Sequence, residues 1–380
     1  MSITRLGEFA EIQTGPFGSQ LHKEDYVLDG TPIVTVEHLG KRHFTEQNLP
    51  RVSDKDKQRL SKYILSEGDI VFSRVGSVDR CSYVDESNDG WMFSGRCLRV
   101  RTNGTVLPLY LYYYFCLEET KQFMRNIAVG ATMPSINTKL MSEVPIEVPA
   151  LKVQRRIVAM LSAIDKKIEL NETINENLTQ QVQALFKERF LSQDALQLGW
   201  KRMTLGEVSE MSAGGDKPKV ISNQRTDACK YPVYSNGISD EGLYGFTTDY
   251  KISSESVTVS ARGTIGFVCL RHIPFTPIVR LITLVPRESI ISAKYLYLWL
   301  KCIPIHGTGT TQQQLTVPDF RKTEIIIPPE VAMREFTETV DPLFQQVWSN
   351  QDESVKLADV RDALLPRLMS GELDVSELNL

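Results

Sequence analysis

The longest regular pattern of apolar positions in this chain is a seven-residue repeat over residues 151–192. Its apolar side chains recur at alternating spacings of three and four residues, which predicts a long α-helix whose apolar face packs against a second helix. At a rise of 1.5 Å per residue, a helix over this range would be about 60 Å long. Two polar positions interrupt the middle of the face, whose members are Ile157, Leu161, Ile164, Ile168, Asn171, Asn175, Leu178, Val182 and Leu185.

A second repeat near the end of the chain matches the first, and Asn350 takes the place of Asn171 at its centre. A helix that packs only on its own domain would show part of this pattern, but the recurring polar break favours a helix pair. In an antiparallel pair, Asn175 would face Asn350, and the buried polar groups would fix the register. Asn171 would face Ser354 in the same arrangement. The second face consists of Phe336, Val340, Leu343, Val347, Asn350, Ser354, Leu357 and Leu364.

Each predicted helix follows a globular stretch of short strand-like runs and glycine-containing loops, such as the predicted strand over residues 31–36. The order of segments is the same in both stretches, where residues 205–207 match 6–8 and residues 295–300 match 110–115. We therefore predict an α/β (α+β) protein with a pseudo-two-fold internal repeat of domain and helix. The expected parts are residues 1–149 (first domain), 150–195 (first helical spacer), 196–328 (second domain) and 329–380 (second helical spacer).

The composition is that of an ordinary globular protein, with 42% hydrophobic and 24% charged residues over 380 positions. A formal net charge of -4 argues against a nonspecific basic coat on nucleic acid but leaves room for local basic patches. Six cysteines are scattered without a CxxC pair, which indicates reduced thiols, and we expect a cytoplasmic protein. No apolar run approaches the ~20 residues of a membrane span, so no membrane partner is expected.

The sequence lacks the common motifs of nucleotide-binding and catalytic sites. The segment Gly214-Gly215-Asp216-Lys217 has neither the spacing nor the hydroxyl of a phosphate-binding GxxxxGK[ST] loop. The five histidines show no metal-ligand spacing, so no metal is expected. These absences together favour a binding protein over an enzyme, and we name no catalytic residue.

Polar loops that recur in both domains are the remaining candidates for function. Arg74 and Arg262 each follow a predicted strand and lie two residues and one residue before a glycine, respectively. Arginine pairs with guanine edges, asparagine and glutamine pair with adenine, and backbone amides at glycines suit phosphate contacts. For any single residue, an ordinary solvated loop is the alternative. The DNA-binding candidates are Lys41, Arg42, His43, Arg74, Ser77, Thr132, Ser135, Asn137, Lys139, Asn236, Arg262, Thr264, Thr310, Thr311, Gln312, Gln313, Gln314 and Thr316.

Over nearly its whole length, the chain resembles the specificity (S) subunit of Type I restriction-modification systems. The resemblance rests on the domain-helix repeat, on the openings over residues 5–8 and 201–207, and on the ending over residues 364–373. It implies that each globular part is a target recognition domain that reads one half of a bipartite site in double-stranded DNA. It also implies that two antiparallel coiled-coil helices act as a ruler between these domains and as a docking surface for two methyltransferase (M) subunits.

The resemblance further implies that this chain is non-catalytic and binds no cofactor. Restriction (R) subunits would join through the complex, an ATP-dependent endonuclease and adenine-N6 DNA methyltransferase that acts in phage defence. S-adenosylmethionine, ATP and Mg would then be held by the partner subunits. A stand-alone two-domain DNA-binding regulator is the main alternative, and it should bind a bipartite site tightly without partners. A coiled-coil scaffold is the other alternative, and it should show no salt-dependent affinity for DNA.

Overall fold

The computed structural model describes residues 2–18, 20–191, 199–307 and 313–375. The chain forms two compact units. Unit 1 comprises residues 1–170 and 352–380, and unit 2 comprises residues 171–351. Among the described residues, no helix is long and apolar enough to cross a membrane.

Unit 1 is built around a four-stranded antiparallel sheet in the order β2-β9-β6-β7. A second sheet has the order β3-β5-β4-β8, and β1 pairs with β10. Its strands are β1 (Ser2–Arg5), β2 (Ala10–Thr14), β3 (Tyr26–Val27), β4 (Thr31–Val34), β5 (Arg51–Val52), β6 (Ile70–Ser73), β7 (Cys81–Tyr83), β8 (Met92–Phe93), β9 (Cys97–Thr102) and β10 (Pro145–Val148). Its short helices are α1 (Asp54–Arg59), α2 (Pro108–Cys116), α3 (Glu118–Ile127) and α4 (Thr138–Ser142).

Strand β6 has consecutive apolar residues instead of the alternation of apolar and polar residues that is typical of a strand with one face in water. Side chains of a strand point alternately to its two faces. Ile70 and Phe72 belong to the core that includes α2, whereas Val71 belongs to the core around β4 and β8. Because both faces of this strand are covered, all four of its residues are buried.

Unit 2 has a four-stranded antiparallel sheet in the order β12-β18-β15-β16, a three-stranded sheet in the order β14-β13-β17, and the pair β11-β19. Its strands are β11 (Lys201–Thr204), β12 (Ser209–Ala213), β13 (Tyr231–Tyr234), β14 (Leu243–Thr247), β15 (Ser256–Val259), β16 (Val268–Arg271), β17 (Thr276–Pro277), β18 (Ile282–Pro286) and β19 (Glu324–Ile327). Its short helices are α6 (Leu205–Val208), α7 (Ala293–Cys302) and α8 (Val317–Phe320).

The two units share the same arrangement of strands and helices, and equivalent tyrosines make equivalent hydrogen bonds in both. The Tyr110 hydroxyl of α2 donates to the Glu147 carbonyl of β10 over 2.9 Å, and the Tyr295 hydroxyl of α7 donates to the Ile326 carbonyl of β19 over 2.7 Å. In each unit the bond ties the helix after the main sheet to the last strand. The predicted α/β fold with an internal repeat is confirmed.

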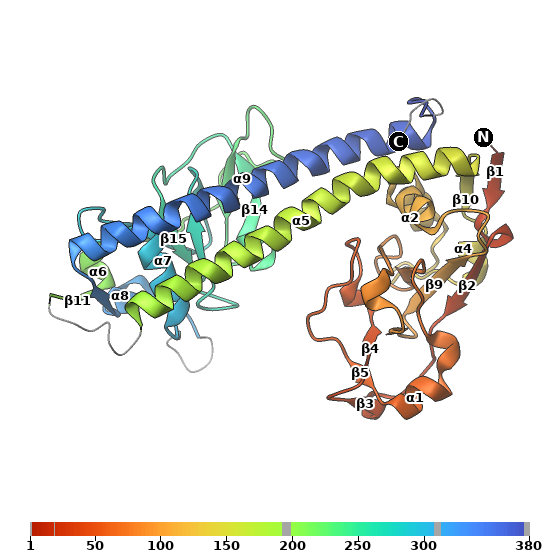
Figure 1. Cartoon of the computed structure of the whole chain (residues 1–380), viewed down its shortest axis with the longest axis horizontal. Coiled ribbons are helices and arrows are strands. Elements are labelled where there is room, and N and C mark those ends of the chain that lie inside the picture. Colours follow the sequence, from red (N-terminus) through yellow and green to blue (C-terminus); the bar gives the residue numbers. More distant parts are fainter. Residues whose placement is uncertain (1, 19, 192–198, 308–312, 376–380) are drawn as a thin grey trace. The chain divides into compact units, whose positions relative to one another are not determined.

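Two long helices, α5 (Leu151–Phe190) and α9 (Glu330–Met369), contain 40 residues each and lie side by side within each unit (Figure 1). Their direction follows from the contacts. In unit 2, Asn175 contacts Asn350 and the later residue Arg189 contacts the earlier residue Glu335, so the helices run antiparallel there. In unit 1, residues 165 and 361 are partners and residues 167 and 353 are partners, which gives the same direction.

Each helix half is part of the core of its unit. Ile157 and Leu161 of α5 and Leu368 of α9 belong to the core of unit 1. Phe186 of α5 and Phe336 of α9 belong to the core of unit 2. Burial of each such side chain contributes about 1.5–3 kcal/mol to stability. The helices therefore pack on their own domains and on each other at the same time.

The buried face of α5 drifts relative to the seven-residue repeat toward the end of the helix. Leu185, a member of the predicted face, is 37% exposed, whereas its neighbour Phe186 is fully buried. A straight α-helix has 3.6 residues per turn and drifts by about 20° per heptad against a 3.5-residue repeat. This drift turns Leu185 out and brings Phe186 and Phe190 in.

Candidate nucleic-acid interface

In unit 1, two of the candidate polar loops lie against each other. The Arg74 carbonyl accepts a hydrogen bond from the Ile136 backbone amide over 3.0 Å, and the Gly76 amide donates to the Pro134 carbonyl over 2.8 Å. An isolated β-bridge joins Val75 to Ser135. The loop after β6 therefore packs on the loop before α4, which brings Arg74 and Ser135 into one surface region.

Unit 2 contains the equivalent loop pair. The Ala261 carbonyl accepts from the Leu315 amide over 3.0 Å, and the Arg262 guanidinium donates to the Gln314 side-chain oxygen over 2.9 Å. A cavity of about 680 Å³ opens between these loops. It is lined by Arg262, Gly263, Ile265, Ile305, His306, Gly307, Gln313 and Gln314. The candidates Thr310, Thr311 and Gln312 lie outside the described residues.

A glycine shapes the first loop of each pair. Gly76 has a φ of +75° and Gly263 a φ of +70°, and a Cβ atom added at either position would meet nothing within 4 Å. The backbone conformation, and not lack of space, therefore requires glycine at both positions. The amide two residues later donates to the glycine carbonyl in both loops, which leaves the exposed candidates Ser77 and Thr264 at the tips of tight turns.

Arg74 is held among three loops of unit 1. Its guanidinium donates to the Gly95 carbonyl over 3.1 Å and lies 5.3 Å from the centre of the Phe17 ring. Phe17 is 54% exposed, and Arg96, whose carbonyl accepts from the Arg74 amide, is also exposed. Sequence reasoning missed Phe17 and Arg96, because a single aromatic or basic residue in a loop carries no periodic signal.

Arg42 and His43 are engaged by carboxylates of their own unit. The Arg42 guanidinium lies 3.2 Å from the Glu169 carboxylate, and His43 bridges Asp85 over 2.5 Å and Glu169 over 2.7 Å. Burial alone would raise the pKa of Asp85, but hydrogen bonds from Ser87 and His43 outweigh burial and lower that pKa. Lys41 is exposed. The contacts of Arg42 and His43 join this segment to α5.

The remaining candidates divide into capping residues and exposed ones. The Asn137 side chain accepts from the Leu140 amide at the start of α4, and the Thr316 side chain accepts from the Asp319 amide at the start of α8. These two caps occupy equivalent positions of the repeat and start the short helix after each polar loop. Thr132, Lys139 and Gln313 are exposed, and Asn236 makes two internal hydrogen bonds that are described below.

A polar network joins α5 to α9 in each unit. In unit 2 the Asn350 side chain donates to the Asn175 side-chain oxygen over 2.9 Å, and Asn171 donates to the Asn350 carbonyl over 3.4 Å. This is the asparagine contact expected from the two repeats.

Within the described residues, no group of three or more histidine, cysteine or carboxylate side chains could hold a metal ion.

In unit 1 the network centres on the buried Asp165. Its carboxylate accepts from Arg361 over 2.9 Å and from the Tyr113 hydroxyl over 2.5 Å. Burial alone would lower the pKa of Arg361, but hydrogen bonds to Asp165 and Asp362 outweigh burial and raise it. The arginine therefore stays charged and ties α9 to α5.

Comparison with known proteins identifies relatives over most of the chain. A family model described as "Type I restriction modification DNA specificity domain" matches residues 1–180 and 197–356. The chain is 28% identical over 415 residues to the specificity subunit of the Type I restriction enzyme MjaIX from Methanocaldococcus jannaschii. The alignment covers 99% of this chain and 94% of that protein. A putative Type I specificity subunit from Mycoplasma pneumoniae is 30% identical over 251 residues, covering 65% of this chain and 67% of the relative.

A solved structure has the same fold. The S subunit of a Type I restriction-modification system from M. genitalium matches with a TM-score of 0.60 at 17% sequence identity. The match covers 97% of this chain and 95% of that one. The arrangement of two similar β-rich domains with packed long helices is therefore shared with a crystal structure.

Proposed function

This chain belongs to the family of DNA specificity subunits of Type I restriction-modification systems, and from that membership we propose how its parts divide the work of recognition. The chain is the non-catalytic subunit of such a system. Residues 1–149 form a target recognition domain for one half of a bipartite site in double-stranded DNA, and residues 196–328 form the domain for the other half. Residues 150–195 and 329–380 are the helical spacers.

The repeated loop pair is the observation that carries this proposal. In each unit a glycine turn after a central strand is hydrogen-bonded to a polar loop that precedes a capped short helix. The two loop pairs are alike in backbone and different in side chains, as expected for two readers of different sequences. Arg74 in the first domain and Arg262 with Gln314 in the second have the side chains that pair with guanine and adenine edges in the major groove.

We assign the spacing between the two half-sites to the helix pair. Each helix contains 40 residues, or about 60 Å at 1.5 Å per residue, and one turn of DNA is about 34 Å. The asparagine contacts in unit 2 and the Asp165–Arg361 pair in unit 1 support a fixed register, because a slip would leave buried polar groups without partners.

The same helices are the proposed docking surface for two methyltransferase subunits, and the restriction subunits join through that complex. Apolar side chains that are exposed on the helices support this role, among them Leu170 at 52% and Val355 at 62% exposure in unit 1 and Val331 at 54% in unit 2. Apolar side chains on a helix surface are removed from water when a partner covers them, which favours association. S-adenosylmethionine, ATP and Mg belong to the partner subunits in this proposal.

Isolation of the tagged chain from its native cells, followed by DNA binding, tests the proposal. We expect a complex with two larger methyltransferase chains per copy, which binds the sequence that the cells methylate. Arg74→Ala should weaken binding by about 1–3 kcal/mol through the first half-site only, and Arg262→Ala through the second only. If the chain is isolated without partners and still binds the methylated sequence tightly, a stand-alone regulator is favoured instead. Equal losses at both half-sites for either variant would contradict the division into two readers.

A further inference from the structure

The connection between β17 and β18 in unit 2 is a turn of unusual residues. Val279 has a φ of +52° and Arg280 a φ of +67°, and the Leu281 amide donates to the Ile278 carbonyl over 3.1 Å. Two consecutive left-handed residues define the tight turn that normally takes Asn-Gly. A β-branched valine and a long arginine are strained there, since their Cβ atoms crowd the backbone.

Two glycines hold this turn from outside. The Val279 amide donates to the Gly215 carbonyl and the Arg280 amide donates to the Gly214 carbonyl, each over 2.9 Å. A Cβ atom at Gly214 would lie 2.7 Å from the Ile278 backbone nitrogen, so no other residue allows this approach. The Gly214-Gly215 pair does not have the spacing of a phosphate-binding loop. Its role is structural, because its two carbonyls hold the strained turn by hydrogen bonds.

Asn236 joins the turn to the candidate recognition loop. Its side-chain nitrogen donates to the Val279 carbonyl over 2.6 Å, and its side-chain oxygen accepts from the Ala261 amide over 2.8 Å. Ala261 directly precedes Arg262, whose side chain contacts Gln314. The turn and the loop therefore form one hydrogen-bonded surface, and both ends of the Asn236 amide are used inside the protein.

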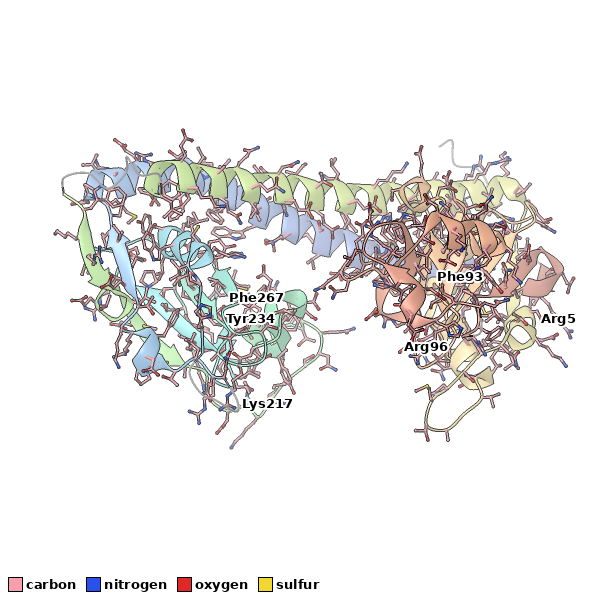
Figure 2. The ribbon with its side chains drawn as sticks, turned by 90° about the horizontal axis from the view of Figure 1, so that it is seen from below. Arg5, Phe93, Arg96, Lys217, Tyr234 and Phe267 are labelled. Carbon is pink, nitrogen blue, oxygen red and sulfur yellow. The ribbon has the colours of Figure 1, made fainter. Side chains whose placement is uncertain are left out.

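This surface is rich in cations. Arg280 is exposed and forms no ion pair with a carboxylate of the described residues. The Lys251 ammonium lies 3.3 Å from the position that a Cβ of Gly215 would take. Lys217 lies 4.2 Å from the ring centre of Tyr244, on the side of unit 2 away from the long helices (Figure 2). Exposed Asp216 lies between Gly215 and Lys217 in the sequence.

We propose that Arg280 is a further DNA-contacting residue, that it binds a phosphate at the second half-site, and that Asn236 is its positioning residue. This inference rests on the proposed function, because it adds a contact to the same reading domain. Backbone strain persists where the surrounding structure over-determines it, and functional sites are where such strain is typically retained. The backbone that carries Arg280 is already held by Gly214, so this part of the site loses little conformational freedom when DNA arrives.

The test uses the full chain assembled with its methyltransferase partner and a duplex that carries the sequence methylated in the native cells. Arg280→Ala should weaken binding to this duplex and to random duplex by a similar factor, about five- to tenfold, and should reduce the salt slope by about one. Arg287→Ala is the matched control, since Arg287 is an exposed arginine just beyond the other end of β18. It should bind like the wild type.

A second set of variants separates contact from stability. Val279→Asn should raise the melting temperature, because asparagine tolerates the left-handed conformation, and should leave DNA affinity unchanged. Asn236→Ala should lower the salt slope as Arg280→Ala does, and the double variant should lower it no further, whereas a merely structural role would lower the melting temperature and leave the slope unchanged.

Two outcomes would overturn the inference. In the first, the wild-type complex prefers its own sequence to random DNA, and both Arg280→Ala and Arg287→Ala have the affinity and the salt slope of the wild type. Arg280 then contacts no DNA. A loss confined to the specific duplex would make Arg280 a base contact and would overturn the phosphate assignment. If the wild-type complex does not distinguish its own sequence from random DNA, the proposed function fails instead.

Discussion

Asn175 and Asn350 form a hydrogen bond in the middle of helix faces that are otherwise mainly apolar. Such a contact contributes little net stability, because both amides give up water, yet loss of one partner leaves the other buried and unsatisfied. The pair therefore acts mainly on the register of the two helices.

We predict that Asn350→Leu lowers the free energy of unfolding by about 1–3 kcal/mol and that the double variant Asn175→Leu/Asn350→Leu recovers most of it. Urea unfolding of the two single variants and the double variant measures the coupling. If the two single losses simply add in the double variant, the asparagines do not act as a pair.

The Asp85 carboxylate, which accepts hydrogen bonds from Ser87 and His43, gives a second prediction at the scale of single residues. Because the pKa of Asp85 is lowered in the folded state, its carboxylate stabilises the fold above the unfolded pKa of about 3.9, and this contribution disappears as the pH falls through the folded pKa. Asp85→Asn should thus be less stable than the wild type at pH 6, by about 1 kcal/mol or less for a partly exposed pair. The difference between the two proteins should shrink as the pH falls through the folded pKa, and a difference that does not change with pH would contradict this assignment.

At the scale of elements, the seven-residue repeat predicted both long helices and their antiparallel pairing. A helix that buries one face needs apolar residues at regular spacings along its sequence, and this spacing can be recognised. The repeat misplaced the end of the buried face on α5. Leu185 fits the repeat, but the buried residue is Phe186, whose ring lies 5.2 Å from that of Tyr295 and 5.8 Å from that of Phe336. The sequence could not reveal this drift, since it depends on how the helix packs on the domain.

This neighbouring pair offers a matched comparison. Phe186→Ala should lower the free energy of unfolding by about 3–5 kcal/mol, because it opens a cavity in the core of unit 2. Leu185→Ala should cost less than about 1 kcal/mol, as expected at a site that is 37% exposed. Thermal unfolding distinguishes the two, and similar losses would mean that Leu185 also belongs to the core.

The candidate recognition surface was predictable only in part. The repeated glycine loops identified Arg74 and Arg262, and the hydrogen bonds between the loops could not be read from the sequence because their partners are far apart in the chain. Arg280, the proposed phosphate contact, was not among the candidates for a different reason. Its turn has none of the residues that signal a turn, since the contacts of Gly214 and Asn236 impose the conformation from outside.

At the scale of the whole molecule, the helix pair makes the length of the unread spacer testable. We predict that one additional heptad in each helix, after Leu170 and after Gln351 where the two compact units meet in sequence, lengthens the tolerated spacer. Seven residues add about 10 Å, or roughly three base pairs, and both half-sites should be unchanged. Methylation mapping in cells measures the spacer.

A heptad added to one helix only is the control. Unit 2 lies between the two insertion points and keeps its own pairing, so the added residues shift the register in unit 1 and separate Asp165 from Arg361. It should destabilise the protein and abolish methylation. A spacer of unchanged length in the variant with two added heptads would rule out the helix pair as the ruler.

Unit 1 is closed by a segment that the ribosome makes only after all of unit 2. Its core includes Leu365, Leu368 and Val375, whereas unit 2 is one continuous stretch from residue 171 to residue 351. Domains generally fold during synthesis in the order in which they emerge. Here the order is reversed: the second half of the chain can complete its fold while the first half still exposes apolar side chains. Termination of translation directly after unit 2 would therefore leave the core of unit 1 incomplete, although residues 1–170 had been made first.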